Sequence, residues 1–216
     1  MNSRVLIFLI LLLSCRYSAA QDSSERITKP NFAEASFLYD FPQSYGLTAG
    51  INLPLRVVNT NIHSSNGKTL AKSKDIIYGV NAGFYRYQFN YTGVFITPFI
   101  GFRHYVHPFL FHETTFGIGV LRTFYDGIDY KVDAAGNVSE EDLYGRYYAT
   151  TSFSWSINFL LRRPNRSILA VQIKPVFWLQ YPYNSFIKPH LSLVAGIKYQ
   201  IAKKSVLVKT KTKHKK

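Results

Sequence analysis

The sequence has little of several residue types on which common protein classes depend. It contains one cysteine and one methionine, and only 12 acidic residues against 26 lysines and arginines. The single cysteine, Cys15, cannot form an internal disulfide, so no disulfide framework is present. Half of the formal net charge of +14 comes from Lys203 to Lys216, which contain seven lysines and no acid. The rest of the chain is only mildly basic, which argues against a folded nucleic-acid-binding face.

Long hydrophobic runs are also missing. The longest apolar stretch is the nine residues Val5 to Leu13, whereas a transmembrane helix needs about 20. Arg4 precedes this stretch and Ser18-Ala19-Ala20 follows it, so the pattern predicts a secretory signal peptide, residues 1–20. Cleavage before Gln21 removes Cys15 from the mature chain.

Lipoprotein processing is an alternative for the same segment. Leu12-Leu13-Ser14-Cys15 loosely resembles a lipobox, in which the cysteine becomes the lipidated N-terminus. Leu13 is bulky where a small residue is usual, which favours the first interpretation.

Period-two alternation dominates the chain after the signal, where helical periodicity, fixed-period repeats and linkers are all missing. Side chains of a strand alternate between its two faces, so Phe153, Trp155 and Phe159 share one face and Ser154, Ser156 and Asn158 the other. The alternating runs are about 11 to 16 residues long, and a strand that crosses a bilayer needs about 9–11. They are 45–57, 76–87, 94–106, 110–125, 146–161, 169–181 and 191–201.

Volume decides which face of these strands is inside. The interior of a barrel of about eight strands is only just wide enough for side chains to fill it. The face with glycine, serine, threonine and asparagine fits that space, and the face with bulky aromatic and aliphatic residues does not. Apolar side chains that face outward are typical of membrane barrels. We therefore predict an all-β chain that forms a closed antiparallel transmembrane β-barrel; a soluble barrel or sandwich is the alternative.

Strand parity adds an eighth strand, because single-chain outer-membrane barrels use even numbers. Asn31–Asp40 is the best candidate, and Ser205–Val208 is the alternative. The predicted organisation is thus a disordered leader (21–30), a barrel (31–202) and a Lys-rich tail (203–216). The tail either lies against an anionic membrane surface or forms a disordered, solubilising end.

The same count fixes the side on which each connection lies. If the last strand ends in the periplasm near Ile201, the acidic connection 126–145, with Ala135-Gly136-Asn137 as its tip, lies outside. Segment 59–74 then lies in the periplasm, where turns are normally short. This conflict stays open at the level of the sequence.

Charged residues on the predicted inner face are the candidate site. They are Arg56, Arg103, Glu113, Lys174 and Lys198. These residues form a hydrogen-bonded plug, or else a positively lined path or an anion-binding spot, and the small interior favours the plug. Pro54 predicts a bulge next to Arg56, because proline removes a ladder donor.

We predict no catalytic residue, metal site or cofactor. His104, His107 and His112 cluster near Pro108, but no serine lies two residues from any of them, so rim histidines are favoured over a nucleophile–base pair. The acids of 126–142 match no calcium-loop spacing, which favours a solvated acidic loop.

The chain resembles the small outer-membrane β-barrel proteins of Bacteroidota. The resemblance rests on the signal that ends in Ala20-Gln21, the long alternating strands, the run 116–124 and the turn Tyr181-Pro182-Tyr183-Asn184. It implies location in the cell outer membrane of a Gram-negative bacterium, but most such proteins have no assigned function. The basic tail departs from the usual ending at the last strand.

The function expected from these features is a structural, adhesive or surface-interaction role without catalysis. The expected partners are outer-membrane lipid, the barrel-assembly machinery and extracellular ligands that bind the loops, and not nucleic acid. An outer-membrane lipid-modifying enzyme and a narrow channel for small solutes remain as alternatives.

Overall fold

The computed structural model describes residues 26–41, 43–63, 69–88, 91–107, 109–126, 129–133, 135–141, 145–161, 169–183 and 186–214. Its ten strands are β1 (Arg26–Asp40), β2 (Ser44–His63), β3 (Thr69–Tyr87), β4 (Tyr91–His107), β5 (Leu110–Tyr125), β6 (Asp129–Val132), β7 (Val138–Glu141), β8 (Arg146–Leu161), β9 (Leu169–Tyr183) and β10 (Phe186–His214). No helix in the described part of the chain is long and apolar enough to cross a membrane. The predicted signal peptide and Cys15 lie outside the described residues.

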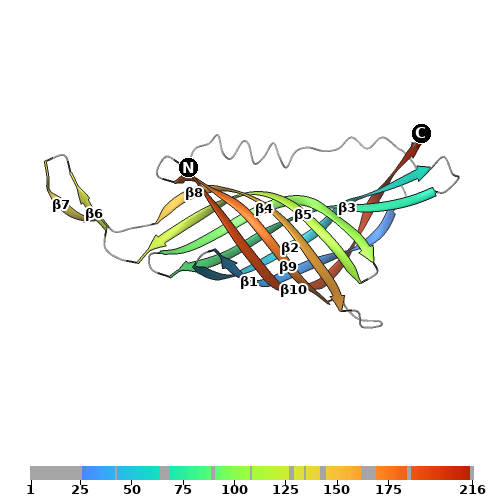
Figure 1. Ribbon diagram of the computed structural model, residues 1–216, viewed down its shortest axis with the longest axis horizontal. Helices are drawn as coiled ribbons and strands as arrows, with labels where there is room; N and C mark the ends of the chain where they lie inside the picture. Colours follow the sequence, from blue (N-terminus) through green and yellow to red (C-terminus); the bar gives the residue numbers. More distant parts are fainter. Residues whose placement is uncertain are drawn as a thin grey trace.

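Eight of these strands form one closed sheet, which confirms the predicted fold class. Neighbours in sequence pair as antiparallel strands from β1 to β5 and from β5 through β8 and β9 to β10, and β10 pairs with β1 to close the ring. Strands β6 and β7 form a separate hairpin that stands away from one end of the barrel (Figure 1). Closure leaves the barrel without the exposed sheet edge of an open sheet.

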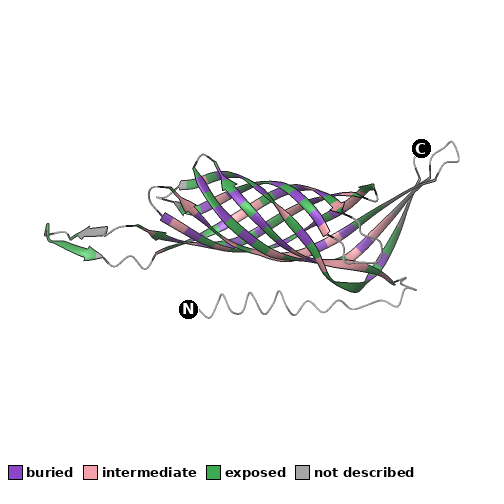
Figure 2. Cartoon of the chain, turned by 90° about the horizontal axis from the view of Figure 1, so that it is seen from below, coloured by how far each residue is buried: buried purple, intermediate pink, exposed green. Residues whose placement is uncertain are grey.

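The bulky face of each strand is on the outside, as volume predicts. Phe153, Trp155 and Phe159 are 52%, 43% and 49% exposed, whereas Ser154, Ser156 and Asn158 are buried. The same alternation recurs around the barrel as bands of exposed and buried residues (Figure 2). An apolar exterior around a polar interior is the pattern of transmembrane barrels.

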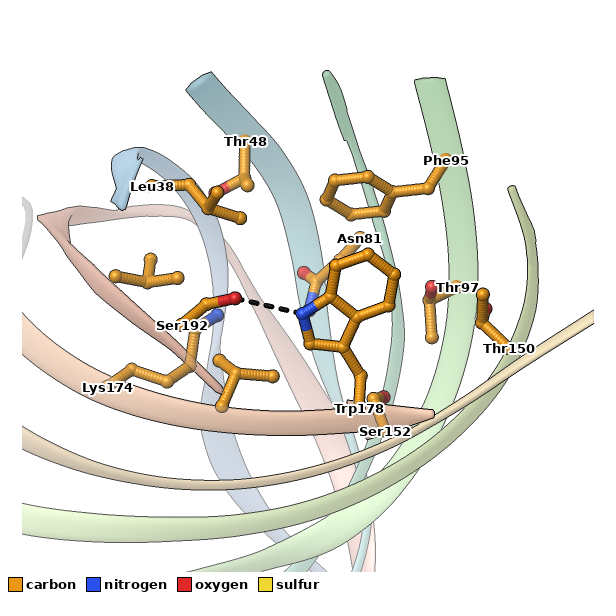
Figure 3. A pocket seen from close by; sticks show the side chains of 12 residues that line it. Leu38, Thr48, Asn81, Phe95, Thr97, Thr150, Ser152, Lys174, Trp178 and Ser192 are labelled. Atoms are coloured by element: carbon orange, nitrogen blue, oxygen red, sulfur yellow. Dashed lines mark hydrogen bonds between the residues drawn. The ribbon is translucent and has the colours of Figure 1, made fainter. Parts of the chain in front are cut away.

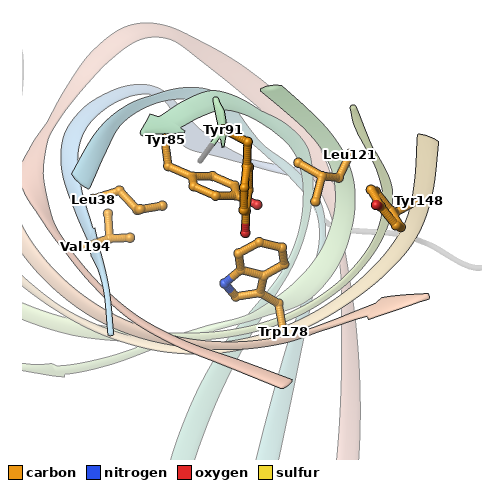
Figure 4. Packing of buried hydrophobic residues seen from close by; sticks show 7 residues of the cluster. All are labelled: Leu38, Tyr85, Tyr91, Leu121, Tyr148, Trp178 and Val194. Atoms are coloured by element: carbon orange, nitrogen blue, oxygen red, sulfur yellow. The ribbon is translucent and has the colours of Figure 1, made fainter. Parts of the chain in front are cut away.

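The interior is less polar than expected. It holds a layer of large side chains, the aromatic cluster (Figure 4). The cluster lies toward the end that carries the β6–β7 hairpin, because Leu121 is near the end of β5 and Tyr148 is near the start of β8. These side chains fit because small residues lie beside them: a Cβ on Gly93, for instance, would lie 2.5 Å from the Tyr85 ring. The buried members of the aromatic cluster are Leu38, Tyr85, Tyr91, Leu121, Tyr148, Trp178 and Val194.

Both terminal strands differ from their predicted bounds. Strand β1 supplies the expected eighth strand but begins at Arg26, within the predicted leader, and β10 continues to His214, through most of the predicted tail. Arg26–Pro30 pair with Lys203–Leu207, so each extension gives the other its backbone partners. Beyond that point Leu207–His214 pair in parallel with Arg56–His63 of β2.

Segment 59–74 forms strand ends where the sequence suggested a loop. Asn59–His63 pair with Thr69–Ser73, so β2 and β3 continue as a hairpin past the barrel wall. Only residues 64–68 between them lie outside the described part of the chain. The connection is therefore shorter than the sequence suggested, because paired backbone groups extend both strands into it, and its periplasmic side stays a prediction.

Prolines mark the place where β1 and β2 part. Their pairing ends at Phe32 with Asn52, just before Pro30 on one strand and Pro54 on the other, and proline has no N–H to donate to a ladder. Bulges accompany both prolines, one at Asn31/Phe32 and one at Pro54/Arg56. We call this place, where β1 and β2 part at the two prolines, the proline seam. Below it, toward the described chain ends, Val57, Val206 and Val208 form a second buried cluster, against which Ile27 packs.

Candidate functional site

Buried charges in the barrel interior form a chain of ion pairs, the charge network: Lys174, Glu34, Lys198, Glu113 and Arg103. Glu34 Oε1 accepts a hydrogen bond from Lys174 Nζ at 2.6 Å, and Glu34 Oε2 lies 3.5 Å from Lys198 Nζ. Lys198 also donates to Glu113, which accepts a second bond from Arg103 Nε at 2.7 Å. All five are buried, so the side chains cross the barrel as one connected layer.

Aromatic rings provide the rest of the surroundings of Arg103. Its guanidinium carbon lies 4.8 Å from the Phe32 ring centre and 5.2 Å from the Phe111 ring centre. Both terminal nitrogens of Arg103 are buried without a hydrogen-bond partner among the described residues. Cation–π attraction thus takes the place of hydrogen bonds for this part of the guanidinium.

A second ion pair borders the charge network toward the chain termini. Lys29 Nζ lies 2.9 Å from Asp75 Oδ1, an ion-pair distance without hydrogen-bond geometry. Asp75 pairs with Arg103 across strands β3 and β4. The buried carboxylates and cations therefore alternate in space, which lowers the cost of taking each of them out of water.

The structure brings together four of the five residues expected here and corrects the fifth. The bulge between Pro54 and Arg56 shifts the alternation of β2 by one residue, so Val57 takes the inner position. Arg56 pairs with Ile76 on the outer face, and no ion pair links it to another described residue. A period-two count that ignores the bulge places Arg56 on the wrong face.

Asp40, His190 and Ser192 form a second buried network, which joins the aromatic cluster. Asp40 accepts hydrogen bonds from Ser192 Oγ at 2.6 Å and from His190 Nδ1 at 2.9 Å. His190 Nε2 lies 3.1 Å from the Gln180 side-chain oxygen, and Trp178 Nε1 donates to Ser192 Oγ at 2.8 Å. The His190 ring stacks on Trp178 at 3.9 Å.

This second network has the residue types of a hydrolase but not the connections. A nucleophilic serine donates its proton to the histidine ring, whereas Ser192 donates to Asp40. Both ring nitrogens of His190 face oxygen acceptors, so neither is free to act as a base. The arrangement fits a structural network better than a catalytic one.

One cavity lies between the two networks. Its volume is about 70 Å³, and its lining includes Lys174 of the charge network and Trp178 and Leu38 of the aromatic cluster (Figure 3). Sites for drug-sized ligands measure roughly 300–1,000 Å³. This cavity therefore has room for a few water molecules only, and side chains fill the barrel on both sides of it.

The three histidines near Pro108 do not converge. His104 Nδ1 lies 3.2 Å from the Ser73 carbonyl oxygen, and His107 Nδ1 accepts a long hydrogen bond from the Phe109 amide. His112 stacks on Trp155 on the outer face, opposite to Glu113. Among the described residues no group of three or more histidine, cysteine, aspartate or glutamate side chains is placed to hold a metal ion.

The β6–β7 hairpin occupies the middle of the acidic connection 126–145. Its tip is the predicted one: Gly136 has φ +85°, and Asp133 accepts bonds from the Ala135 and Asn137 amides and the Asn137 side chain. The bonds from Asn137, side chain first, lower the pKa of Asp133, because they favour the charged carboxylate. Val132 and Val138 pair across the hairpin and are 63% and 64% exposed.

Sequence reasoning missed Glu34, Asp40 and His190. In β1 the inner face is Phe32, Glu34, Ser36, Leu38 and Asp40, and its mixture of charge and apolar bulk hides the alternation. His190 lies two residues before Ser192, where continuing the period of the last strand backward places it on the inner face. The signal that could have found Glu34 is the alternation of polar residues on the strand face opposite to Phe37 and Tyr39.

Comparisons with known proteins assign no family. No family model matches the chain, and no curated protein matches it either. Neisserial surface protein A is similar in structure at 9% identity and a TM-score of 0.48, over 81% of this chain and 99% of that chain. Ail, the attachment invasion locus protein of Yersinia pestis, is 8% identical with a TM-score of 0.42, over 82% and 99%. The outer membrane enzyme PagL is 11% identical with a TM-score of 0.37, over 79% and 99%.

Proposed function

We propose that this protein is an outer-membrane β-barrel that presents the β6–β7 hairpin as a surface for interaction with partners. The observation that carries the proposal is the hairpin itself. It stands away from the barrel at the end opposite to the described chain ends, and neither of its strands pairs with another described strand (Figure 1). An isolated two-stranded hairpin is marginally stable in water, so a partner strand or surface that binds this hairpin stabilises its fold.

The exterior supports the membrane part of this proposal. Exposed apolar side chains follow one another on the outer face of single strands, as Phe116, Ile118 and Val120 do at 50%, 60% and 48% exposure. Such a face is expensive in water and stable in lipid. Closure of the sheet satisfies the backbone groups that lipid cannot.

The interior supports an interaction role over transport. The charge network and the aromatic cluster each cross the barrel, and the cavity between them measures about 70 Å³. A conducting pore needs a continuous polar path, which these two layers interrupt. Ser192 and His190 lack the connection that catalysis by a serine hydrolase requires.

Charge and exposure on the hairpin define the chemistry of the partner. Asp133 and Glu140 are exposed, and the exposed pair Val132 and Val138 lies between them. Asp126, which precedes the hairpin, is partly neutralised by Arg86, whose Nη2 lies 2.6 Å from its carboxylate. The partner expected here is a basic surface with a small apolar patch.

Cells that display the full-length protein test this role. We expect them to adhere to amine-coated beads more than to carboxylate-coated ones, and to lose that preference when residues 129–141 are replaced by a glycine-serine linker. The matched control replaces residues 162–168, which connect β8 to β9 in the sequence, with a linker of equal length. Both variants are first shown to migrate as heat-modifiable, detergent-requiring barrels. Unchanged adhesion of the 129–141 variant would contradict the interaction role, and solubility without detergent would contradict the membrane barrel.

A further inference from the structure

Three cations gather on the outer wall where β10 crosses to β2. Backbone pairing joins Lys209 to Val58 and Val58 to Lys74, so the two lysines flank one valine on adjacent strands. Arg56 lies two residues before Val58 on the same strand and therefore on the same face. Lys74 and Lys209 are exposed and Arg56 is half-buried.

The three side chains lie on the outer face of the sheet, because their neighbours in sequence occupy the inner face. Val57, Asp75 and Val208 are one residue away on their strands, pair with one another in the same order, and are buried. Successive residues of a strand point to opposite faces. Arg26, also exposed, begins β1 beside Leu207 and brings a fourth cation to the same level.

No carboxylate balances these charges within the described part of the chain. Asp75, which follows Lys74 in the chain, faces inward and pairs with Lys29. No ion pair involves Arg56, Lys74 or Lys209 and another described residue, and Arg56 Nε is buried without a hydrogen-bond partner. Arg56 lies diagonally across from Lys74 and from Lys209, at about 7–8 Å, and like charges this close repel one another unless an anion neutralises them.

The position of the cluster indicates which anion. The cations border the apolar exterior of the barrel. Leu207 is 39% exposed, and Phe102 and Val106, on either side of His104, are 56% and 57% exposed. His104 of β4 pairs with Lys74 of β3 and lies on the same face. At the border between an apolar belt and water, lipid phosphates are the anions present at the highest density.

We propose that Arg56, Lys74 and Lys209 form a binding site for the phosphate of an anionic phospholipid, in the leaflet at the end of the barrel where the described chain begins and ends. The cluster holds the headgroup while the exposed apolar wall above it contacts the acyl chains. This inference rests on the membrane barrel proposed above. Each basic residue near an anionic surface contributes about fivefold in affinity.

Native mass spectrometry of the full-length protein in detergent, with phosphatidylglycerol or phosphatidylcholine added, measures this binding. We expect phosphatidylglycerol to be retained at least tenfold more strongly, and Lys74→Gln with Lys209→Gln to remove most of that preference. The matched control is Lys203→Gln with Lys204→Gln, an equal loss of charge about 20 Å away along β10.

Each outcome separates this inference from the proposal on which it rests. Equal loss of preference in both double variants would overturn a local site, because overall charge then explains the binding. Displacement of the lipid by millimolar inorganic phosphate would overturn the lipid assignment in favour of a free anion. A protein that inserts into phosphatidylcholine vesicles without preferring phosphatidylglycerol loses the site and keeps the membrane barrel. Failure to insert into any vesicle contradicts the barrel itself.

Discussion

Glu34 connects two otherwise separate cations. Its two carboxylate oxygens face Lys174 and Lys198, and Asn52 donates a further hydrogen bond to it at 3.0 Å. Both lysines are buried, and of the two only Lys174 lines the cavity, so Lys198 has no water as an alternative partner. A buried ion pair contributes little net stability compared with apolar packing, but breaking one leaves a costly unpaired charge.

Substitution Glu34→Gln is therefore expected to destabilise the barrel strongly. Loss of one member of a buried pair costs about 3–5 kcal/mol. The unfolding midpoint in urea, followed through the heat-modifiable band, measures the effect. Exposed Glu140 supplies the control, Glu140→Gln, which is expected to leave the midpoint within error. Equal midpoints for the two variants would contradict a role for Glu34 in the charge network.

For single residues, the sequence predicts which charged side chains face the interior only where the alternation of the strand is unbroken. Arg103 and Glu113 both face inward, as alternation predicts, and the register of β4 and β5 pairs them. Arg56 does not face inward, because a bulge, which adds one residue to one strand, reverses the faces beyond it. Which inner charges meet also depends on register between strands far apart in sequence, such as Glu34 and Lys198, and alternation carries no information about register.

Strand β10 illustrates what period and parity miss at the scale of elements. Its 29 residues pair with three partners: β9 and β1 as antiparallel strands, and β2 as a parallel one. The alternation of Val206, Leu207 and Val208 indicates a strand, but seven lysines after residue 202 resemble a solvated tail. Pairing decides the outcome, because backbone groups on β1 and β2 need partners below the proline seam.

Removal of residues 203–216 is expected to destabilise the barrel without preventing membrane insertion. The truncation exposes Val57 and deletes Val206 and Val208, and burial of a valine contributes about 1.5–3 kcal/mol. Thermal loss of the heat-modifiable form in detergent measures the change. Removal of residues 215–216 alone is the control. A truncated chain as heat-resistant as the control would show that the tail adds nothing to the barrel.

The exposed acids of the described chain gather at one end of the molecule. The described acids that are exposed lie on the connection 126–145, whereas the opposite end carries Lys74, Lys203 and Lys209. The interior separates these ends with two layers, one of ion pairs and one of aromatic rings. Composition reveals the net charge but not this separation, because the separation depends on which connections share an end of the barrel.

Planar bilayers are expected to show no stepwise ion current with the wild-type protein. Ions have to pass both layers, and an eight-stranded barrel is narrow enough for side chains to fill. Tyr85→Ala with Trp178→Ala opens the aromatic layer but leaves the charge network in place, so this variant is expected to stay silent too. Resolvable wild-type current steps would favour the narrow channel over the filled barrel.

The parallel pairing of β10 with β2 has a consequence for the order of folding. Residues 207–214 meet residues 56–63, so this contact joins nearly the first and nearly the last parts of the folded chain. Contacts between residues distant in sequence slow folding, because loop-closure entropy is lost before they form. We therefore expect hairpins such as β4–β5 to form early and the ring to close last, where β10 meets β2. Until the final residues of the chain have paired, the valines below the two prolines stay uncovered. During this time the two unpaired edges of the incomplete barrel have to be kept apart.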